Sequence, residues 1–308
     1  MKFKNVPINL PSINGKPQYD FPQHPHLIKQ PFTQIACGVR GSGKTYSIIQ
    51  QLKMMYDADM FDKYYVVSPT MESDIKQKIF YDEVASKKKL IYYKELNEEV
   101  FDEILQDLEY DIQKFKEYQK IKKVMEKLRK MGADKMSDDE LFLLMPYLET
   151  IEDISTIDEC FEDIHKKNHP PMSQLILDDC FGVKLLQKNV GNPFIQFLIR
   201  HRHKFCSITI AVQSLSYLPR SIRMNSIFWT IFPIRDKKQL DILYTETASC
   251  WKDAKQFEDT MALVASEAHQ FLYLDTSDAL QPDLRIGFDK KIILDIYRDY
   301  NKTDGTIS

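Results

Sequence analysis

One short stretch of the chain combines glycines, a lysine and a threonine at a spacing that suits phosphate chemistry. Gly38, Gly43, Lys44 and Thr45 form the pattern Gly-x-x-x-x-Gly-Lys-Thr, the Walker A motif or P-loop. Glycines let backbone N–H groups approach a phosphate chain, the lysine reaches the β- and γ-phosphates, and the threonine hydroxyl binds Mg²⁺. The motif therefore predicts a nucleotide site. The residues assigned to it are Gly38, Val39, Arg40, Gly41, Ser42, Gly43, Lys44, Thr45 and Tyr46.

A second stretch, Gln174-Leu-Ile-Leu-Asp178-Asp179, is an apolar run that ends in two acids. A P-loop enzyme needs an acid at the end of a neighbouring strand to hold the water shell of Mg²⁺, and we assign Asp178 to this role. It also needs a group that polarises the water attacking the γ-phosphate, and we assign Asp179 to it. Many strands end in an acidic turn, so this stretch is interpreted as a Walker B motif only because the chain also contains a P-loop. Together the motifs predict nucleotide hydrolysis, with Thr45 and Asp178 as ligands of Mg²⁺.

A third candidate is the amide of Gln213, at the end of a strand predicted over residues 207–213. In hydrolysing sheets with one strand between the Walker A and Walker B strands, a polar group here can contact the γ-phosphate and the attacking water. Gln213 is the candidate for this sensor role. The alternative is a glutamine that begins a loop.

The charge is distributed unevenly along a chain whose net charge is −3. Residues 180–235 contain no Asp or Glu and eight basic residues, which leaves a charge of −11 on the rest. Such a block suits a surface that faces the phosphates of nucleic acid or of a neighbour's nucleotide, although a solvated basic face is the alternative. The candidates for contact with DNA are Lys184, Lys188, Arg220 and Arg223.

The pattern of apolar residues predicts an α/β fold with a mostly parallel sheet flanked by helices. A proline-rich N-terminal arm over residues 1–31 precedes a P-loop domain over residues 32–308. A helical insertion over about residues 96–168 interrupts this domain between the early strands and the Walker B strand. It contains a long helix with one apolar seam, which we expect to pack within the chain rather than as a coiled coil with a partner. The long helix is predicted over residues 98–131, and further helices over 44–56, 137–148, 155–165, 192–204, 236–244 and 252–266. Strands are predicted over 63–69, 225–233 and 270–275, and a strand, a helix and a polar tail over 283–308.

Composition excludes several classes of protein. Apolar residues make up 43% and charged residues 28% of the 308 residues, as in soluble globular proteins. We find no apolar stretch long enough to span a membrane and no secretory signal. The five cysteines include no Cys-x-x-Cys pair, so we expect reduced, buried thiols in a reducing compartment and no zinc site.

The order of the motifs carries a resemblance to a known family. The P-loop is followed by Asp178-Asp179, Arg200-x-Arg202, Gln213 and the turn Leu218-Pro219-Arg220-Ser-Ile-Arg223. In this order the chain resembles the genome-packaging ATPases of nucleocytoplasmic large DNA viruses, the poxvirus type, within the FtsK–HerA superfamily of DNA-pumping motors. The resemblance covers residues 31 to about 276. In one respect the chain departs from it, because many members carry Glu where this chain has Asp179, one methylene shorter.

The resemblance implies a RecA-like P-loop NTPase core, ATP with Mg²⁺, and a homo-oligomeric ring, a pentamer or hexamer, around double-stranded DNA. It also implies capsid or other packaging proteins as partners, and a virion or a viral factory in the host cytoplasm as the location. In this superfamily an arginine shortly before the sensor strand can serve the neighbouring subunit's site. By position this is Arg202, with Arg200 as the second choice.

Other functions are compatible with the P-loop. One is a different ATPase of nucleic-acid metabolism, such as a helicase-like enzyme or a conjugation-type DNA pump. A P-loop kinase would need a basic lid over a second substrate, whereas the insertion is amphipathic and mixed in charge. A nucleotide-gated scaffold that does not hydrolyse would have no need of the acid pair after Walker B.

Overall fold

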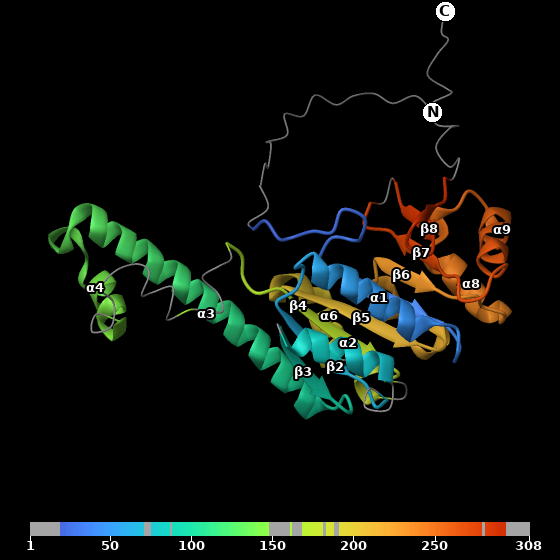
Figure 1. The fold of residues 1–308 in the computed structure, drawn as a ribbon, viewed down its shortest axis with the longest axis horizontal. Coiled ribbons are helices and arrows are strands. Elements are labelled where there is room, and N and C mark those ends of the chain that lie inside the picture. The colour runs from blue at the N-terminus through green and yellow to red at the C-terminus, as the bar shows by residue number, and fades with distance from the viewer. Residues whose placement is uncertain are drawn as a thin grey trace, which may run out of the picture.

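The computed structural model describes residues 19–70, 75–86, 88–147, 161, 168–180, 183–187, 191–278 and 281–293. Within them a nine-stranded sheet has the order β3-β2-β4-β5-β1-β6-β7-β8-β9 (Figure 1). The strands are β1 Thr33–Cys37, β2 Lys63–Val67, β3 Lys89–Tyr93, β4 Ser173–Asp178, β5 Cys206–Val212, β6 Phe228–Ile231, β7 Leu272–Asp275, β8 Asp283–Ile286 and β9 Lys290–Lys291.

Strands β1 to β6 are mutually parallel, and β7, β8 and β9 add to the β6 edge in antiparallel pairs. The central strands are buried along their whole length, as expected of parallel strands covered on both faces. The predicted mostly parallel α/β sheet is confirmed. β5 lies between the P-loop strand β1 and the Walker B strand β4, which gives the strand arrangement of a RecA-like P-loop NTPase.

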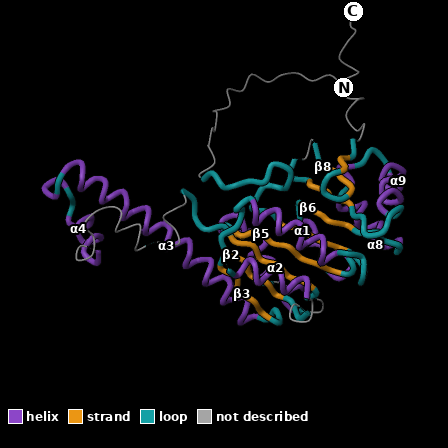
Figure 2. Tube along the Cα trace, in the orientation of Figure 1, coloured by secondary structure: helices purple, strands orange, loops and turns teal. Residues whose placement is uncertain are grey.

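Helices cover both faces of the sheet (Figure 2). One apolar layer, which includes Ile48, Phe80 and Ile176, joins α1 and α2 to the first face. The layer on the second face includes Phe101 and Leu177 and joins the remaining helices of the core. The helices are α1 Lys44–Asp57, α2 Ile75–Ala85, α3 Glu98–Met131, α4 Asp138–Leu144, α6 Pro193–Arg200, α7 Arg220–Met224, α8 Lys237–Glu246 and α9 Ala254–Val264.

The insertion is built on α3, which has the predicted bounds and runs beyond the sheet (Figure 1). Asn97 caps its first turn, and Gly132 ends it. Its first half packs on the sheet, and its far half packs against α4 through a separate cluster that includes Phe115 and Leu144. The apolar seam therefore packs within the chain, as predicted. A capping box at Ser137 opens α4, whereas only residue 161 of the helix predicted over residues 155–165 is described.

A charged network fixes α3 to β2. The Lys63 ammonium donates to Asp107 Oδ2 at 3.1 Å and to Asp111, and the hydroxyl of Tyr65 donates to Asp107 Oδ2 at 2.8 Å. The side chain of Lys63 is 5% exposed, and those of Asp107 and Asp111 are 23% and 15% exposed. A buried lysine without these carboxylates would be costly, so the network ties the insertion to the sheet.

The described part of the N-terminal arm, residues 19–31, packs on its own domain. Leu27 and Ile28 are buried in the α1 face, and the Ile28 amide donates to the Tyr273 hydroxyl at 3.0 Å. The C-terminal prediction is revised in part, because Lys290–Lys291 pairs with β8 as a strand and residues 294–308 lie outside the described residues. Among the helices that the structure describes, none is both long and apolar enough to cross a membrane.

Candidate nucleotide site

The P-loop forms the turn between β1 and α1, and its glycines are required there for two reasons. Gly41 and Gly43 have φ of 79° and 99°, in the left-handed region that side chains rarely adopt. At Gly38 there is no room for a side chain, because a Cβ would lie 2.5 Å from Ser42 Oγ and 2.9 Å from Phe232 Cβ. The loop therefore folds closely over the end of its own strand.

Lys44 and Thr45 begin α1, where free N–H groups and the positive end of the helix dipole favour an anion. Lys44 is 9% exposed although it carries a charge. Below it, burial raises the pKa of Cys37 to about 12, so this thiol is an inert part of the floor. Cys180, Cys206 and Cys250 are likewise buried and free, and Cys160 lies outside the described residues.

Asp178 lies at the carboxyl end of β4 and is 7% exposed. Because strand side chains alternate, it shares the sheet face of Ile176, which is the face that α1 covers. Asp178 therefore lies on the face of the sheet that is covered by α1, the helix whose first turn contains Thr45. β4 is two strand spacings from β1, about 10 Å, and runs parallel to it, so Asp178 lies at the same end of the sheet as the P-loop. Hydroxyl and carboxylate oxygens are the donors that Mg²⁺ prefers, so the residues fit the predicted ion.

Asp179 and Gln213 meet at the carboxyl edge of the sheet. Asp179 has a φ of 53°, a left-handed conformation that Asp tolerates better than most residues. The turn brings its carboxylate to the end of β5, where Gln213 Nε2 donates to Asp179 Oδ1 at 3.0 Å. The two residues predicted to act on the attacking water are thus direct neighbours, although they are 34 positions apart.

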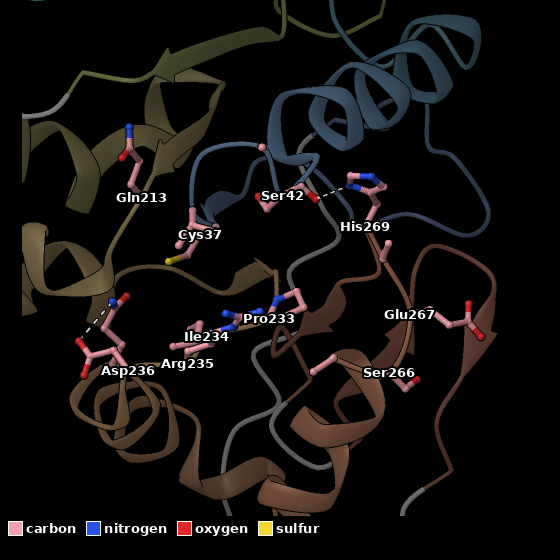
Figure 3. A pocket seen from close by; sticks show the side chains of 16 residues that line it. Cys37, Ser42, Gln213, Pro233, Ile234, Arg235, Asp236, Ser266, Glu267 and His269 are labelled. Atoms are coloured by element: carbon pink, nitrogen blue, oxygen red, sulfur yellow. Dashed lines mark hydrogen bonds between the residues drawn. The ribbon is translucent and has the colours of Figure 1, made fainter.

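A cavity of about 710 Å³ lies beside the P-loop (Figure 3). Gln213 and the P-loop form one side, the segment that leads from β6 into α8 forms another, and the connection between α9 and β7 forms the third. Neither of the last two segments is predicted from the sequence, because nothing in their local pattern indicates that β7 begins beside the P-loop. Their residues in the cavity are Pro233, Ile234, Arg235, Asp236, Gln239, Ala265, Ser266, Glu267, Ala268 and His269.

Arg200 and Arg202 lie far from their own P-loop. They precede β5, whereas Gln213 follows it, and the seven residues of β5 span about 20 Å. Arg202 lines another cavity, of about 750 Å³, together with Lys29, Lys116 and Phe205. In the described part of the chain its guanidinium forms no hydrogen bond or ion pair. A role for Arg202 at the P-loop of its own subunit is therefore excluded by distance.

The four candidates for DNA contact divide into three groups. Lys184 and Arg220 are exposed on the segments that follow β4 and β5. Arg223 does not fit its predicted role, because its side chain is 12% exposed and pairs with Glu246 at 3.2 Å while also donating to the carbonyls of Leu215 and Leu218. Lys188 lies outside the described residues.

Comparison with protein-family models and with curated proteins finds no match for this sequence. Among solved structures, the chain is similar to the genome packaging NTPase B204 from Sulfolobus turreted icosahedral virus 2 in complex with AMP, with 15% identity, 87% of this chain and 100% of that chain covered, and a TM-score of 0.48. The DNA-packaging ATPase B204 from Sulfolobus Turreted Icosahedral Virus is similar at 13% identity, with 83% and 98% covered and a TM-score of 0.47. The pCW3 conjugation coupling protein TcpA is similar at 13% identity, with 86% and 68% covered and a TM-score of 0.40.

Proposed function

We propose that this chain is an ATP-hydrolysing motor that translocates double-stranded DNA, as a homo-oligomeric ring that packages a viral genome. The observation that carries the hydrolytic part is the contact between Asp179 and Gln213 at the strand ends beside the P-loop. The P-loop alone supports nucleotide binding. A carboxylate and an amide held together next to it supply the groups that orient and polarise a water.

Each residue of the site has a distinct task in this proposal. Backbone N–H groups of the loop and the Lys44 ammonium neutralise the charge of the phosphates. Thr45 and Asp178 would hold Mg²⁺, which would supply positive charge against the negative charge of the phosphates. Asp179 accepts a proton from the attacking water, and Gln213 orients this water and senses the γ-phosphate. The cavity beside the loop provides the space for the base and the ribose.

Two alternatives fit the site less well. A kinase needs an element that closes over a second substrate, whereas α3 leads away from the P-loop and carries α4 at its far end (Figure 1). A scaffold that binds nucleotide without hydrolysis does not need the contact between Asp179 and Gln213.

In such a ring, we infer that Arg202 acts on the nucleotide of a neighbouring subunit. Arg202 is exposed and has no hydrogen-bond or ion-pair partner among the described residues. It lies at the opposite end of β5 from its own nucleotide site, so its guanidinium is available to a neighbouring subunit. Such an arginine supplied by another subunit can raise the rate by about 10³ to 10⁵ in other P-loop enzymes.

Mixing of two inactive variants tests this role. Arg202→Ala subunits retain their Walker motifs, and Lys44→Ala subunits retain their arginine. If Arg202 acts across the interface, mixed rings contain some complete sites, and ATPase activity returns. Absence of activity at every ratio, with mixed assembly verified by mass, would remove Arg202 from the mechanism.

Translocation is tested with a duplex that carries a short third strand near one end. A motor that moves along the duplex displaces the third strand in the presence of ATP. We expect displacement by the wild-type protein and none by Lys44→Ala. An active ATPase that leaves the third strand in place would contradict the motor function while preserving the assignment of the hydrolytic site.

A further inference from the structure

His269 connects the antiparallel part of the sheet to the P-loop. It lies on the connection between α9 and β7, and its Nδ1 is 3.1 Å from the carbonyl oxygen of Ser42, 227 positions away (Figure 3). This carbonyl can only accept a hydrogen bond, so Nδ1 carries the proton and donates it. The contact joins a segment without any nucleotide motif to the residue before Gly43.

The backbone of His269 indicates that its position is strongly determined. Its φ is 63°, in the left-handed region, which is uncommon for residues other than glycine. Glycine at this position would avoid the steric cost of the conformation. The imidazole also packs closely on the loop, because a Cβ placed on Gly43 would lie 3.3 Å from Nδ1. The side chain is thus held against the peptide that joins Ser42 to Gly43.

Peptide geometry gives this contact a consequence for phosphate binding. A trans peptide is planar, so the carbonyl of Ser42 and the N–H of Gly43 point in opposite directions. A carbonyl held by His269 therefore turns the N–H of Gly43 away from the imidazole. Within the described residues this N–H forms no hydrogen bond, which leaves it free for a phosphate oxygen.

We propose that His269 is a positioning residue of the P-loop, which orients the peptide between Ser42 and Gly43 for binding of the triphosphate. The proposal rests on the function proposed above, since it concerns the same nucleotide. It does not require the imidazole to touch the nucleotide. The Walker motifs do not contain this element, which comes from the antiparallel part of the sheet.

Two substitutions separate the hydrogen bond from the backbone conformation. The side-chain amide nitrogen of Asn is bonded to Cγ, as Nδ1 of His is, and Asn tolerates a positive φ. His269→Asn therefore keeps a donor at the same place. His269→Gly accepts the backbone conformation and removes the donor, and His269→Ala removes the donor without the added freedom of glycine.

The measurement is the dissociation constant of a fluorescent ATP analogue for the full chain, together with the melting temperature. We expect His269→Gly and His269→Ala to weaken binding by about fivefold to tenfold, the value of one hydrogen bond, and His269→Asn to stay within about twofold of wild type. Asp59→Gly is the matched control, since Asp59 also has a positive φ, 54°, but follows the far end of α1. Its affinity for ATP should equal that of wild type.

The following results would overturn the proposal. Wild-type affinity in both donorless variants would mean that the hydrogen bond has no role. Equal weakening in His269→Asn and His269→Gly would mean that the ring rather than its donor matters. If the wild-type protein bound the analogue no better than Lys44→Ala does, the proposed function itself would fail, and this inference with it. If Lys44→Ala weakened binding of the analogue and His269→Gly did not, the inference about His269 would be rejected and the proposed function would stand.

Discussion

At the scale of single residues, the most informative contact is the one between Gln213 and Asp179. A hydrogen bond of 3.0 Å to one carboxylate oxygen holds the carboxylate in place and leaves the second oxygen available to a water. The left-handed backbone of Asp179 is the local feature that brings its short side chain to Gln213. The two residues should therefore act as a unit.

We expect Asp179→Asn and Gln213→Ala each to keep ATP affinity and to lower turnover strongly, because both groups act on the transition state. The double variant should be hardly slower than the slower single variant, since groups that act as a unit give non-additive effects. ATP binding and steady-state ATPase rates, measured on the same preparations, check this expectation. Multiplicative losses in rate would show that the two residues act independently.

The residues of the site differ in how well the sequence predicts them. The P-loop, Asp178 and Gln213 are recognisable because each sits at a fixed place relative to its own strand. Only its charge indicates Arg223 as a DNA contact, and charge does not reveal that Glu246, 23 positions later, is its partner. His269 has no local signal, since its contact with Ser42 depends on how β7 returns to the sheet.

At the scale of elements, the insertion helix α3 was predictable to the residue. Its seam, the Asn97 cap and Gly132 are all local features, and local features decide helix ends. The contacts that attach α3 to β2 are not predictable from such local features, because they join residues far apart in the sequence. The sequence predicts Lys63 at the start of a buried strand, but it does not show that two aspartates of α3, 44 and 48 positions later, pair with the buried ammonium.

Removal of the Lys63 ammonium should therefore destabilise the protein. Lys63→Met leaves two largely buried carboxylates without their main partner, and we expect the free energy of unfolding to fall by about 3 kcal/mol. Lys89→Met is the matched control, because Lys89 reaches the same Asp107 at 3.6 Å from a side chain that is 58% exposed. Its cost should stay below about 0.5 kcal/mol. Urea denaturation of both variants checks this, and equal stabilities would contradict the structural role of the network.

At the scale of the whole molecule, the sequence predicted the mostly parallel sheet but not its full extent. The alternation of strands and helices indicates a parallel core, whereas the pairing of β7, β8 and β9 depends on long-range contacts. The net charge of −3 does not reveal how basic residues are placed on the surface. Lys184 and Arg220 are both exposed, on the segments that follow the neighbouring strands β4 and β5.

If these two side chains contact the DNA backbone, binding of duplex DNA should weaken steeply with salt and depend little on sequence. Each phosphate contact contributes about 0.9 to the slope of log affinity against log salt, so Lys184→Ala with Arg220→Ala should flatten the slope by about 1.8. Arg223→Ala should instead reduce stability, because Glu246 loses its partner. One slope shared by wild type and the double variant would exclude Lys184 and Arg220 from the DNA contact.

The central claim is that the P-loop site hydrolyses ATP and that duplex DNA controls this hydrolysis. The direct test is the steady-state ATPase rate of the purified chain with and without duplex DNA. Lys44→Ala serves as the inactive variant, and Lys53→Ala, an exposed position on the same helix, serves as its control. We predict that DNA raises the rate severalfold in wild type and Lys53→Ala, and that Lys44→Ala shows no turnover. A rate that DNA leaves unchanged, or one that survives in Lys44→Ala, would contradict the account.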